Sequence, residues 1–393
     1  MKKVLIANAK SATSLAVIRS LGLKGIEITG ATDSTYDIPL VSKFCRHKIF
    51  LKTDHLDTDD RISELLDIVR LHQFDVFMPV MSETLLRPLS KLKYEFEKFT
   101  KLPIPDFETF NYFDDKSETT KLQIKNNIPC PKTYILDNDE EINSIIDKAD
   151  YPLVIKPFMG EGAEGIRFIT HPEDVITEYR KIKEVHGPCI IQEFVPGEKY
   201  TAVFLLDAES MPKRFFVHRA IREYPISGGP TCFLESVKYD KIFDIGVNLL
   251  RSVNFFGLAS MEFIVDERDD VPKIIDVNPR FYGPLQCAIS AGADFPYALL
   301  LLAVNGNIDV DFTYQAGIRC RNLLFEDTKH LISVWRGVKS PKYKIGKIQT
   351  LVNYLNFCRD DSYFILSLSD PKPAILKLYN LIRTTESIQS NNR

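Results

Sequence analysis

The sequence lacks several features that would mark whole classes of protein. Its seven cysteines are scattered and include no C-x-x-C pair, so neither a disulfide framework nor a zinc knuckle is expected. No apolar run approaches the roughly 20 residues that cross a bilayer, and no stretch reads as a signal peptide. Fifty basic residues against 53 acidic ones give a net charge of −3, so no general polyanion binding follows. We therefore expect a cytoplasmic protein with no nucleic-acid partner and no membrane partner.

Two nucleotide-binding fingerprints are also missing. The first predicted strand is followed by N-A-K-S-A-T rather than by G-x-G-x-x-G, which argues against a dinucleotide-binding dehydrogenase. The phosphate-binding sequence G-x-x-x-x-G-K-[ST] does not occur either. Any nucleotide site in this chain must therefore be built in another way.

The length of 393 residues predicts two or three domains, and the pattern changes along the chain. In the first hundred residues short apolar runs alternate with helical periodicity, which predicts a parallel α/β sheet with ligands at the strand carboxyl ends. The predicted strands are 4–7, 27–31, 47–51 and 76–80, and the helices between and after them are 11–22, 57–71 and 82–99. Later segments are a linker at 102–107, a helix at 114–126, a strand-rich stretch at 151–310, helices at 327–338 and 374–382, and a frayed end at 385–393.

The first motif with chemical content is an apolar strand that ends in a lysine and a glycine loop. Lys156 closes the strand, and Gly160, Gly162 and Gly165 follow within the next nine residues. Such a loop can fold its backbone N–H groups around phosphate oxygens while the lysine supplies charge. The alternative is a flexible hairpin beside a solvated lysine.

The second motif is a strand that runs into a short linker with two acids. Gln192, Glu193, Phe194 and Val195 could present backbone groups to the edge of a base, and Glu198 could accept hydrogen bonds from a ribose. The alternative is a hairpin whose acids are solvated, and this reading is favoured when the segment is taken alone.

The third motif places hard oxygen ligands on two neighbouring strands. Asp276 and Asn278 alternate with Val277 and so project from one face, Glu262 can lie opposite them, and Arg280 falls on the same face. Two carboxylates and an amide suit Mg²⁺ that is shared with nucleotide phosphates, and Mn²⁺ could substitute. An arginine there can clamp phosphate or carboxylate. The alternative is an exposed polar strand face.

In this order, with Asp115-Lys116 ahead of them, the motifs resemble the ATP-grasp superfamily over roughly 75–305, in its carboxylate–amine ligase or carbamoyl-phosphate-synthase-like branch. The resemblance implies a mixed α/β and α+β fold, with a parallel α/β domain at 1–113 and a C-terminal extension at 311–393. Between them it implies a two-lobed ATP-grasp domain at 114–310, with lobes 114–190 and 191–310.

The resemblance also implies roles for individual residues. The phosphates of ATP would contact Lys116, Lys156 and the mobile loop Gly160–Gly165, while Arg280 would lie near the transferred phosphate. The middle metal ligand of the family is commonly Glu, and this chain departs from that pattern with Asp276. The base would contact Gln192, Glu193, Phe194 and Val195, the ribose Glu198, and Mg²⁺ would be bound by Glu262, Asp276 and Asn278.

Two further stretches look like substrate elements. Arg219 or Arg222 could stabilise an acyl phosphate, and Gly228 and Gly229 could bind a substrate carboxylate through the backbone. Ser82 and Glu83 lie at a strand end that would face the site, although helix capping by Ser82 is an equal alternative. His218, which directly precedes Arg219, is interpreted as an ordinary strand histidine.

These expectations amount to an ATP-dependent ligase that phosphorylates a carboxylate to an acyl phosphate, joins it to an amine and releases ADP and phosphate. A carbamoyl-phosphate-synthase-like or biotin-carboxylase-like enzyme using bicarbonate is one alternative, and a non-catalytic nucleotide-binding protein is another. The expected partners are small-molecule carboxylate and amine substrates, and a homodimer is possible.

Overall fold

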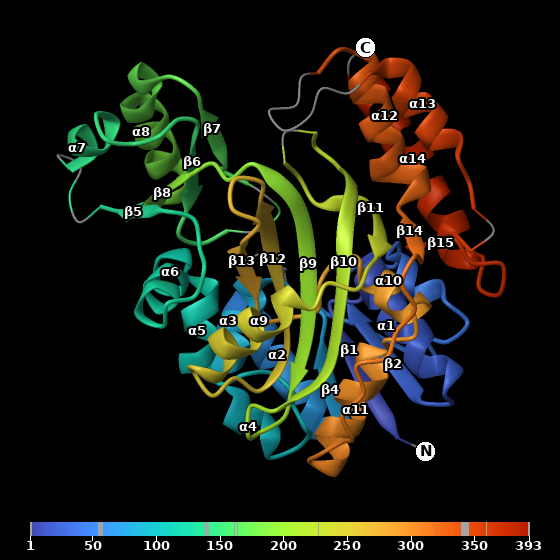
Figure 1. Cartoon of the computed structure of the whole chain (residues 1–393). Coiled ribbons are helices and arrows are strands. Elements are labelled where there is room, and N and C mark those ends of the chain that lie inside the picture. Colours follow the sequence, from blue (N-terminus) through green and yellow to red (C-terminus); the bar gives the residue numbers. More distant parts are fainter. Residues whose placement is uncertain are drawn as a thin grey trace.

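Three β-sheets, each built from a different part of the chain, organise the structure (Figure 1). The computed structural model describes residues 2–53, 58–136, 138, 141–160, 162, 164–226, 228–338, 346–358 and 360–391. In this part of the chain no helix is both long and apolar enough to span a membrane. The mixed α/β architecture with an N-terminal parallel sheet confirms the predicted fold class.

The N-terminal sheet is parallel and has the strand order β3-β2-β1-β4. Val4, Leu5, Ile6 and Ala7 of the inner strand β1 are fully buried, because helices cover both sheet faces, and this explains the unbroken apolar run. The predicted long helix after β4 is in fact two short ones that meet at Leu92. The elements are β1 Lys3–Ala7, α1 Ala12–Leu23, β2 Glu27–Thr32, β3 His47–Phe50, α2 Thr58–His72, β4 Val76–Pro79, α3 Glu83–Lys91 and α4 Lys93–Glu97, with a 3-10 turn at Ile38–Val41.

Two helices lead into a small lobe with an antiparallel four-stranded sheet of order β5-β8-β6-β7. The first of them, α5, begins at Phe107, where the sequence predicted only a linker, because Asp106 caps it by accepting from the backbone N–H of Thr109. The elements are α5 Phe107–Asp114, α6 Lys116–Lys125, β5 Thr133–Ile135, α7 Ile142–Ile146, β6 Leu153–Pro157, β7 Arg167–Ile169, α8 Val175–His186 and β8 Cys189–Glu193, with a 3-10 turn at Pro172–Asp174.

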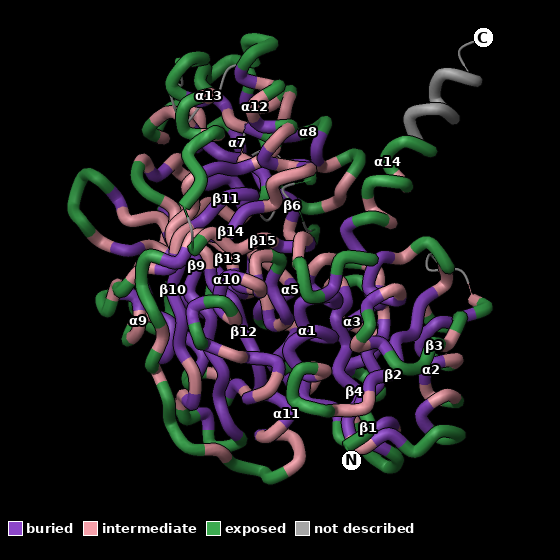
Figure 2. The backbone as a smooth tube through the Cα atoms, turned by 90° about the vertical axis from the view of Figure 1, so that its right-hand side faces the viewer, coloured by how far each residue is buried: buried purple, intermediate pink, exposed green. Residues whose placement is uncertain are grey.

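The third sheet has seven strands in the order β13-β12-β9-β10-β11-β14-β15. One of its faces shares a hydrophobic core with α1 and β1, so the large sheet and the N-terminal domain are packed against each other (Figure 2). The elements up to residue 305 are β9 Gly197–Leu206, β10 Pro212–Glu223, β11 Thr231–Ser236, α9 Lys241–Arg251, β12 Gly257–Asp266, β13 Pro272–Asn278, α10 Leu285–Ser290 and α11 Phe295–Asn305.

The segment after residue 310 does not stand apart from the large lobe. Its strands β14 and β15 extend the seven-stranded sheet, and Phe325, Phe364 and Ala374 join the shared core. A structural boundary at 310 would therefore cut a sheet. The helix α13 has no counterpart among the predicted elements, and α14 continues through the expected frayed end. The elements are β14 Arg319–Arg321, a π-helical turn Leu323–Asp327, α12 Thr328–Trp335, α13 Lys347–Leu355, β15 Ser362–Tyr363 and α14 Lys372–Asn391.

Candidate functional site

A pocket of about 380 Å³ lies between the small-lobe sheet and the large sheet. One wall comes from β6, β8 and the glycine loop, and the other comes from β9, β12, β13 and the segment that precedes β11. Of the site residues predicted from the sequence, the pocket is lined by Lys116, Lys156, Gly160, Gly162, Gln192, Glu193, Phe194, Val195, Gly228, Gly229, Glu262, Asp276, Asn278 and Arg280.

One part of the pocket is apolar and adjoins the linker between the lobes. Phe168 and Phe194 meet edge to face with ring centroids 6.0 Å apart. The carboxylate of Glu193 is already engaged, since it accepts from the backbone N–H of Lys132 at 3.0 Å and pairs with Arg268 at 3.1 Å. Burial alone would raise the pKa of Glu193, but these contacts outweigh it and the pKa lies below its ordinary value. The apolar side chains here are Val154, Ile166, Phe168, Val195, Ile264 and Ile275.

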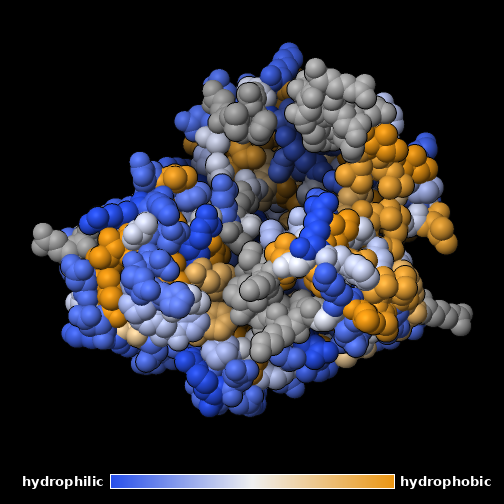
Figure 3. Space-filling model, turned by 90° about the horizontal axis from the view of Figure 1, so that it is seen from above, coloured by the Kyte–Doolittle hydropathy of each residue, from blue (hydrophilic) through white to orange (hydrophobic). Residues whose placement is uncertain are grey.

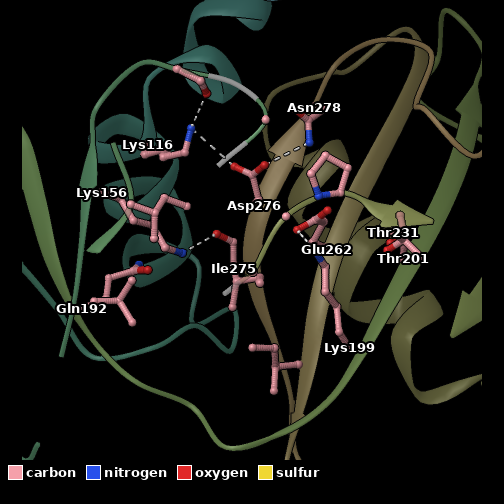
Figure 4. A pocket seen from close by; sticks show the side chains of 18 of the residues that line it. Lys116, Lys156, Gln192, Lys199, Thr201, Thr231, Glu262, Ile275, Asp276 and Asn278 are labelled. Atoms are coloured by element: carbon pink, nitrogen blue, oxygen red, sulfur yellow. Dashed lines mark hydrogen bonds and ion pairs between the residues drawn. The ribbon is translucent and has the colours of Figure 1, made fainter. Parts of the chain in front are cut away.

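Two lysines reach the pocket from different elements (Figure 4). Asp115 caps α6 by accepting from the N–H groups of Ser117 and Glu118, which places Lys116 at the first helical position. The ammonium of Lys116 donates to the carbonyl of Gly160 at 3.1 Å and lies 3.6 Å from Asp276. The helix start and the glycine loop are thus joined through this side chain.

Lys156 is buried near the end of β6, and its ammonium donates to the carbonyl of Ile275 at 3.4 Å. Burial lowers the pKa of Lys156 to about 8, with Asp276 opposing the shift and Lys116 adding to it. The charge of Lys156 is poorly compensated by the surrounding protein groups, and an anionic group bound beside it would stabilise that charge.

The three side chains predicted as metal ligands lie next to one another on two paired strands. Glu262 on β12 is paired in register with Asp276 on β13, and the amide of Asn278 donates to Asp276 at 3.1 Å. Burial would raise the pKa of Asp276, but Lys116 and Lys156 lower it below its ordinary value, so Asp276 stays ionised. Arg280 donates to Asn278 at 3.3 Å and therefore lies on the same face.

The residues present fit a Mg²⁺ ion that is shared with a phosphate group. Glu262, Asp276 and Asn278 provide oxygen donors from two adjacent strands. Among the described residues no group of three or more His, Cys, Asp or Glu side chains could hold an ion by itself. Phosphate oxygens would have to complete the coordination, which is the usual way in which Mg²⁺ is bound at nucleotide sites.

Lys199 is a pocket residue that the sequence reasoning missed. Its ammonium lies 2.8 Å from Glu262 and 3.1 Å from Glu223, and the lysine side chain is nearly buried. Burial would lower its pKa, but the two carboxylates, Glu262 first, raise it well above the ordinary value. Lys199 lies two residues before Thr201 on β9, so the two side chains share one face of the strand, and both line the pocket. This strand spacing could have identified Lys199.

Several predicted residues lie outside the pocket lining. Glu198 is exposed at the start of β9, where it accepts from the hydroxyl of Tyr200 at 2.8 Å and pairs with Arg219 at 3.4 Å. Arg219 also pairs with Glu235 at 3.2 Å. A ribose contact by Glu198 and an acyl-phosphate contact by Arg219 therefore find no support in this geometry, because both side chains are paired with each other outside the pocket.

Arg222 is likewise directed away from the pocket. Its guanidinium forms two hydrogen bonds with the buried carboxylate of Asp327, at 2.5 and 2.9 Å, and Arg321 contacts the same carboxylate. The predicted catalytic contact is replaced by a buried ion-pair cluster that fastens β10 to the π-helical turn. Sequence alone could not reveal this, because Asp327 lies more than a hundred residues away.

The remaining predicted residues, Gly165, Ser82 and Glu83, lie next to the pocket lining rather than in it. Gly165 has φ +72°, and a Cβ there would lie 2.7 Å from Pro157, so this glycine is required by the backbone. Ser82 occupies the N-cap position of α3 without a side-chain capping bond. Glu83 lies behind the pocket and accepts from the Arg280 guanidinium at 2.5 Å. Glu83 therefore positions a pocket residue rather than lining the pocket.

Comparison with known proteins agrees with this geometry. Residues 113–284 match the model of the ATP-grasp domain. The pyruvate carboxylase of Aspergillus terreus is 25% identical over 191 residues, which cover 45% of this chain and 16% of that protein. The C-terminal section of the carbamoyl phosphate synthase large chain from Methanocaldococcus jannaschii is 27% identical over 184 residues, covering 44% and 29%. The chain thus spans less than a third of the length of either relative.

Solved structures share the fold over most of the chain. Biotin carboxylase from Campylobacter jejuni, in complex with an ATP analogue, has a TM-score of 0.67 at 15% identity, covering 81% of this chain and 74% of its own. N5-carboxyaminoimidazole synthetase from Staphylococcus aureus has a TM-score of 0.64 at 15% identity, and the match covers 86% of this chain and 85% of the synthetase chain. The biotin carboxylase domain dimer of the Hydrogenobacter thermophilus 2-oxoglutarate carboxylase, with MgADP, ADP and bicarbonate, has a TM-score of 0.65 at 17% identity, covering 81% and 73%.

The order of the motifs, the two-lobed pocket that they form and these comparisons lead to one conclusion. Residues 113–284 form an ATP-grasp domain; the chain is similar in sequence to carbamoyl phosphate synthase and shares its fold with biotin carboxylase.

Proposed function

We propose that this protein is an ATP-dependent ligase that activates a carboxylate as an acyl phosphate and joins it to an amine. The observation that carries the proposal is the convergence of Lys116 and Lys156 on the carboxylate of Asp276 across the pocket. Cationic groups beside a carboxylate–amide cluster suit the phosphates of ATP with Mg²⁺, where phosphoryl transfer depends on positioning and charge stabilisation.

The residues divide the pocket into two ends. The apolar end beside Gln192 and Val195 suits a purine base, since flat apolar walls and backbone groups are what a base requires. Beyond the carboxylate cluster, Arg280 and the backbone of Gly228 and Gly229 suit a substrate carboxylate. Lys116, Lys156 and Arg280 would then offset the charge on the phosphoryl group between the two ends.

The chemistry divides into two balanced steps. A carboxylate oxygen attacks the terminal phosphorus of ATP, the P–O bond of the acyl phosphate forms and ADP leaves. The amine nitrogen then attacks the acyl carbon, the C–N bond forms, and inorganic phosphate leaves with the former carboxylate oxygen while the amine loses a proton. Closure of the loop around Gly160 and Gly162 would keep water from the labile acyl phosphate.

A second candidate uses bicarbonate as the carboxylate. It is favoured by the similarity to carbamoyl phosphate synthase and to a biotin carboxylase domain whose structure contains bicarbonate. The pocket geometry suits either acid, so the two candidates share the first chemical step and differ in the acceptor. A homodimer of this chain, as in the dimeric biotin carboxylase domain, stays a prediction.

A screen of phosphate release tests the proposal. The full chain with Mg·ATP is incubated with carboxylates paired with amines, and with bicarbonate alone or with amines, and mass spectrometry identifies the product. We expect release above the ATP-only background for one pair, and its loss in Asp276→Ala and Lys156→Met. Arg70→Lys, at an exposed ion pair of α2 away from the pocket, is the matched control. Binding of Mg·ATP without turnover on any acid would instead favour a non-catalytic nucleotide-binding protein.

A further inference from the structure

The C-terminal helices carry an unusual share of the exposed hydrophobic side chains. Of the 26 large hydrophobic residues that are exposed in the described chain, 13 lie between Ile332 and Ile382. Hydrophobic residues gather on the right-hand side of Figure 3, the side on which Figure 1 places these helices. A soluble monomer rarely exposes so much apolar surface in one region. We call the following set the C-terminal apolar face: Ile332, Trp335, Val338, Ile348, Val352, Leu355, Ile375, Leu378, Tyr379 and Ile382.

The helix α13 turns its apolar stripe outward. Ile348, Val352 and Leu355 follow the i, i+4, i+7 spacing of one helical face and are 77%, 57% and 60% exposed. On the opposite side Thr350 is buried, and its hydroxyl donates to the carbonyl of Gly346 at 2.9 Å. A surface helix normally buries the apolar stripe and exposes the polar one, so this arrangement leaves a hydrophobic surface to be covered.

The helix α14 repeats the arrangement. Ile375, Leu378, Tyr379 and Ile382 also follow one helical face and are exposed. The inward side packs Ala374 and Leu376 against the shared core. It is also held by polar groups: Asn380 donates to the backbone carbonyl of Tyr36 at 2.9 Å, and Lys377 and Arg383 lie over the rings of Phe325 and Tyr36. Figure 2 shows that α14 is buried near its start and becomes mainly exposed farther along, beside the N-terminal domain. The apolar residues are therefore held outward by the packing of this helix.

The same region is strongly basic within an acidic protein. Residues 311–393 contain thirteen Lys and Arg and seven Asp and Glu, a net charge of +6 in a chain of net −3. From Thr328 to Arg359 there are seven Lys and Arg and no acid. Three acids of the extension are buried in ion pairs: Asp327 with Arg222 and Arg321, Asp361 with Arg319 at 2.7 Å, and Asp370 with Arg19 at 2.9 Å. These acids therefore pair with internal arginines and do not offset the exposed basic side chains of the described extension, which include Lys329, Arg336, Lys347, Lys372 and Arg383.

We propose that the C-terminal apolar face binds the surface of an anionic membrane. Apolar stripes flanked by Lys and Arg, with an exposed tryptophan and tyrosine, are the features of helices that lie in the interface between acyl chains and headgroups. A second copy of the chain is a poorer occupant, because a symmetric contact would bring two basic surfaces together. The expectation of no membrane partner rested on the lack of a spanning segment, which interfacial binding does not need.

Vesicle co-sedimentation of the full chain tests this proposal. The probes are neutral phosphatidylcholine vesicles and vesicles that also contain phosphatidylglycerol. We expect binding to the anionic vesicles and a fall with added salt. The triple variant I348Q/V352Q/L355Q should weaken binding by about tenfold or more, and so should K347E/K372E. Leu71→Gln, at an equally exposed leucine of α2, is the matched control and should bind as the unchanged chain does.

The outcomes separate the possible occupants of the face. Failure to bind anionic vesicles, or equal binding by the triple variant, would overturn the proposal. A concentration-dependent dimer that the triple variant abolishes in analytical ultracentrifugation would assign the face to a second copy. Phosphate release in solution should be unaffected by the α13 substitutions, because none of these residues lines the pocket. The membrane proposal therefore succeeds or fails independently of the proposed ligase activity.

Discussion

The depressed pKa of Lys156 predicts that ATP binding weakens in alkaline solution. Burial disfavours the ammonium and lowers the pKa of Lys156 to about 8. Phosphate groups beside the nitrogen would raise the pKa again, so binding takes up a proton above pH 8. The contribution of Lys156 to ATP binding is then complete below about pH 8, and it is lost as the pH rises from there towards the raised pKa of the complex. The dissociation constant for Mg·ATP should rise about tenfold between about pH 7 and about pH 9, equivalent to about 1.4 kcal/mol.

Titration calorimetry measures this effect directly. The dissociation constant is determined across the pH range, and proton uptake is obtained from buffers of different ionisation enthalpy. Lys156→Arg keeps a charge that does not titrate in this range, so it should bind ATP with little pH dependence. Lys156→Met should bind weakly and equally at both pH values. A tenfold rise that persists in Lys156→Met would refute the reasoning, because another group would then be responsible.

Three other predictions follow from individual side chains. Lys199→Met removes the cation that contacts Glu262 and Glu223, and should lower the free energy of unfolding by about 3–5 kcal/mol in urea denaturation; an unchanged midpoint would contradict it. Burial, with the charge of Lys199, lowers the pKa of His218 to about 3, so stability should fall by about 2 kcal/mol as the pH drops from neutral to about 5. His218→Gln should lessen that loss, and an identical acid profile would count against it. Asp276→Glu should keep more turnover in the phosphate-release assay than Asp276→Ala; equal losses would remove Asp276 from the metal site.

Much of the fold was predictable because local patterns determine it. The strands β1 and β4 are buried on both faces and read as unbroken apolar runs, and the helix α2 shows its periodicity directly. The C-terminal helices were harder to predict because many of their apolar side chains are exposed. The apolar stripe of α13 faces solvent, so its pattern gives no guide to the core.

The candidate site was predictable where the spacing of residues within a strand or loop determines which side chains lie together. Asp276, Asn278 and Glu262 follow from alternation and strand pairing. The roles given to Glu198 and Arg222 lack support because distant partners decide where charged side chains point. Arg222 is held by Asp327 across more than a hundred residues, and Lys199 is drawn to Glu223 and Glu262 on other strands. The partners in such long-range ion pairs leave no local signal in the sequence, although strand spacing could have placed Lys199 itself at the pocket.

The most direct test of the central claim follows the oxygen atoms of the substrate. The carboxylate that supports turnover is labelled with ¹⁸O, and the phosphate and nucleotide products are examined by mass spectrometry. An acyl phosphate intermediate predicts that one labelled oxygen appears in inorganic phosphate and that the nucleotide product is unlabelled ADP. Labelled AMP released together with pyrophosphate would contradict the account, because the acid would then have been activated by adenylation.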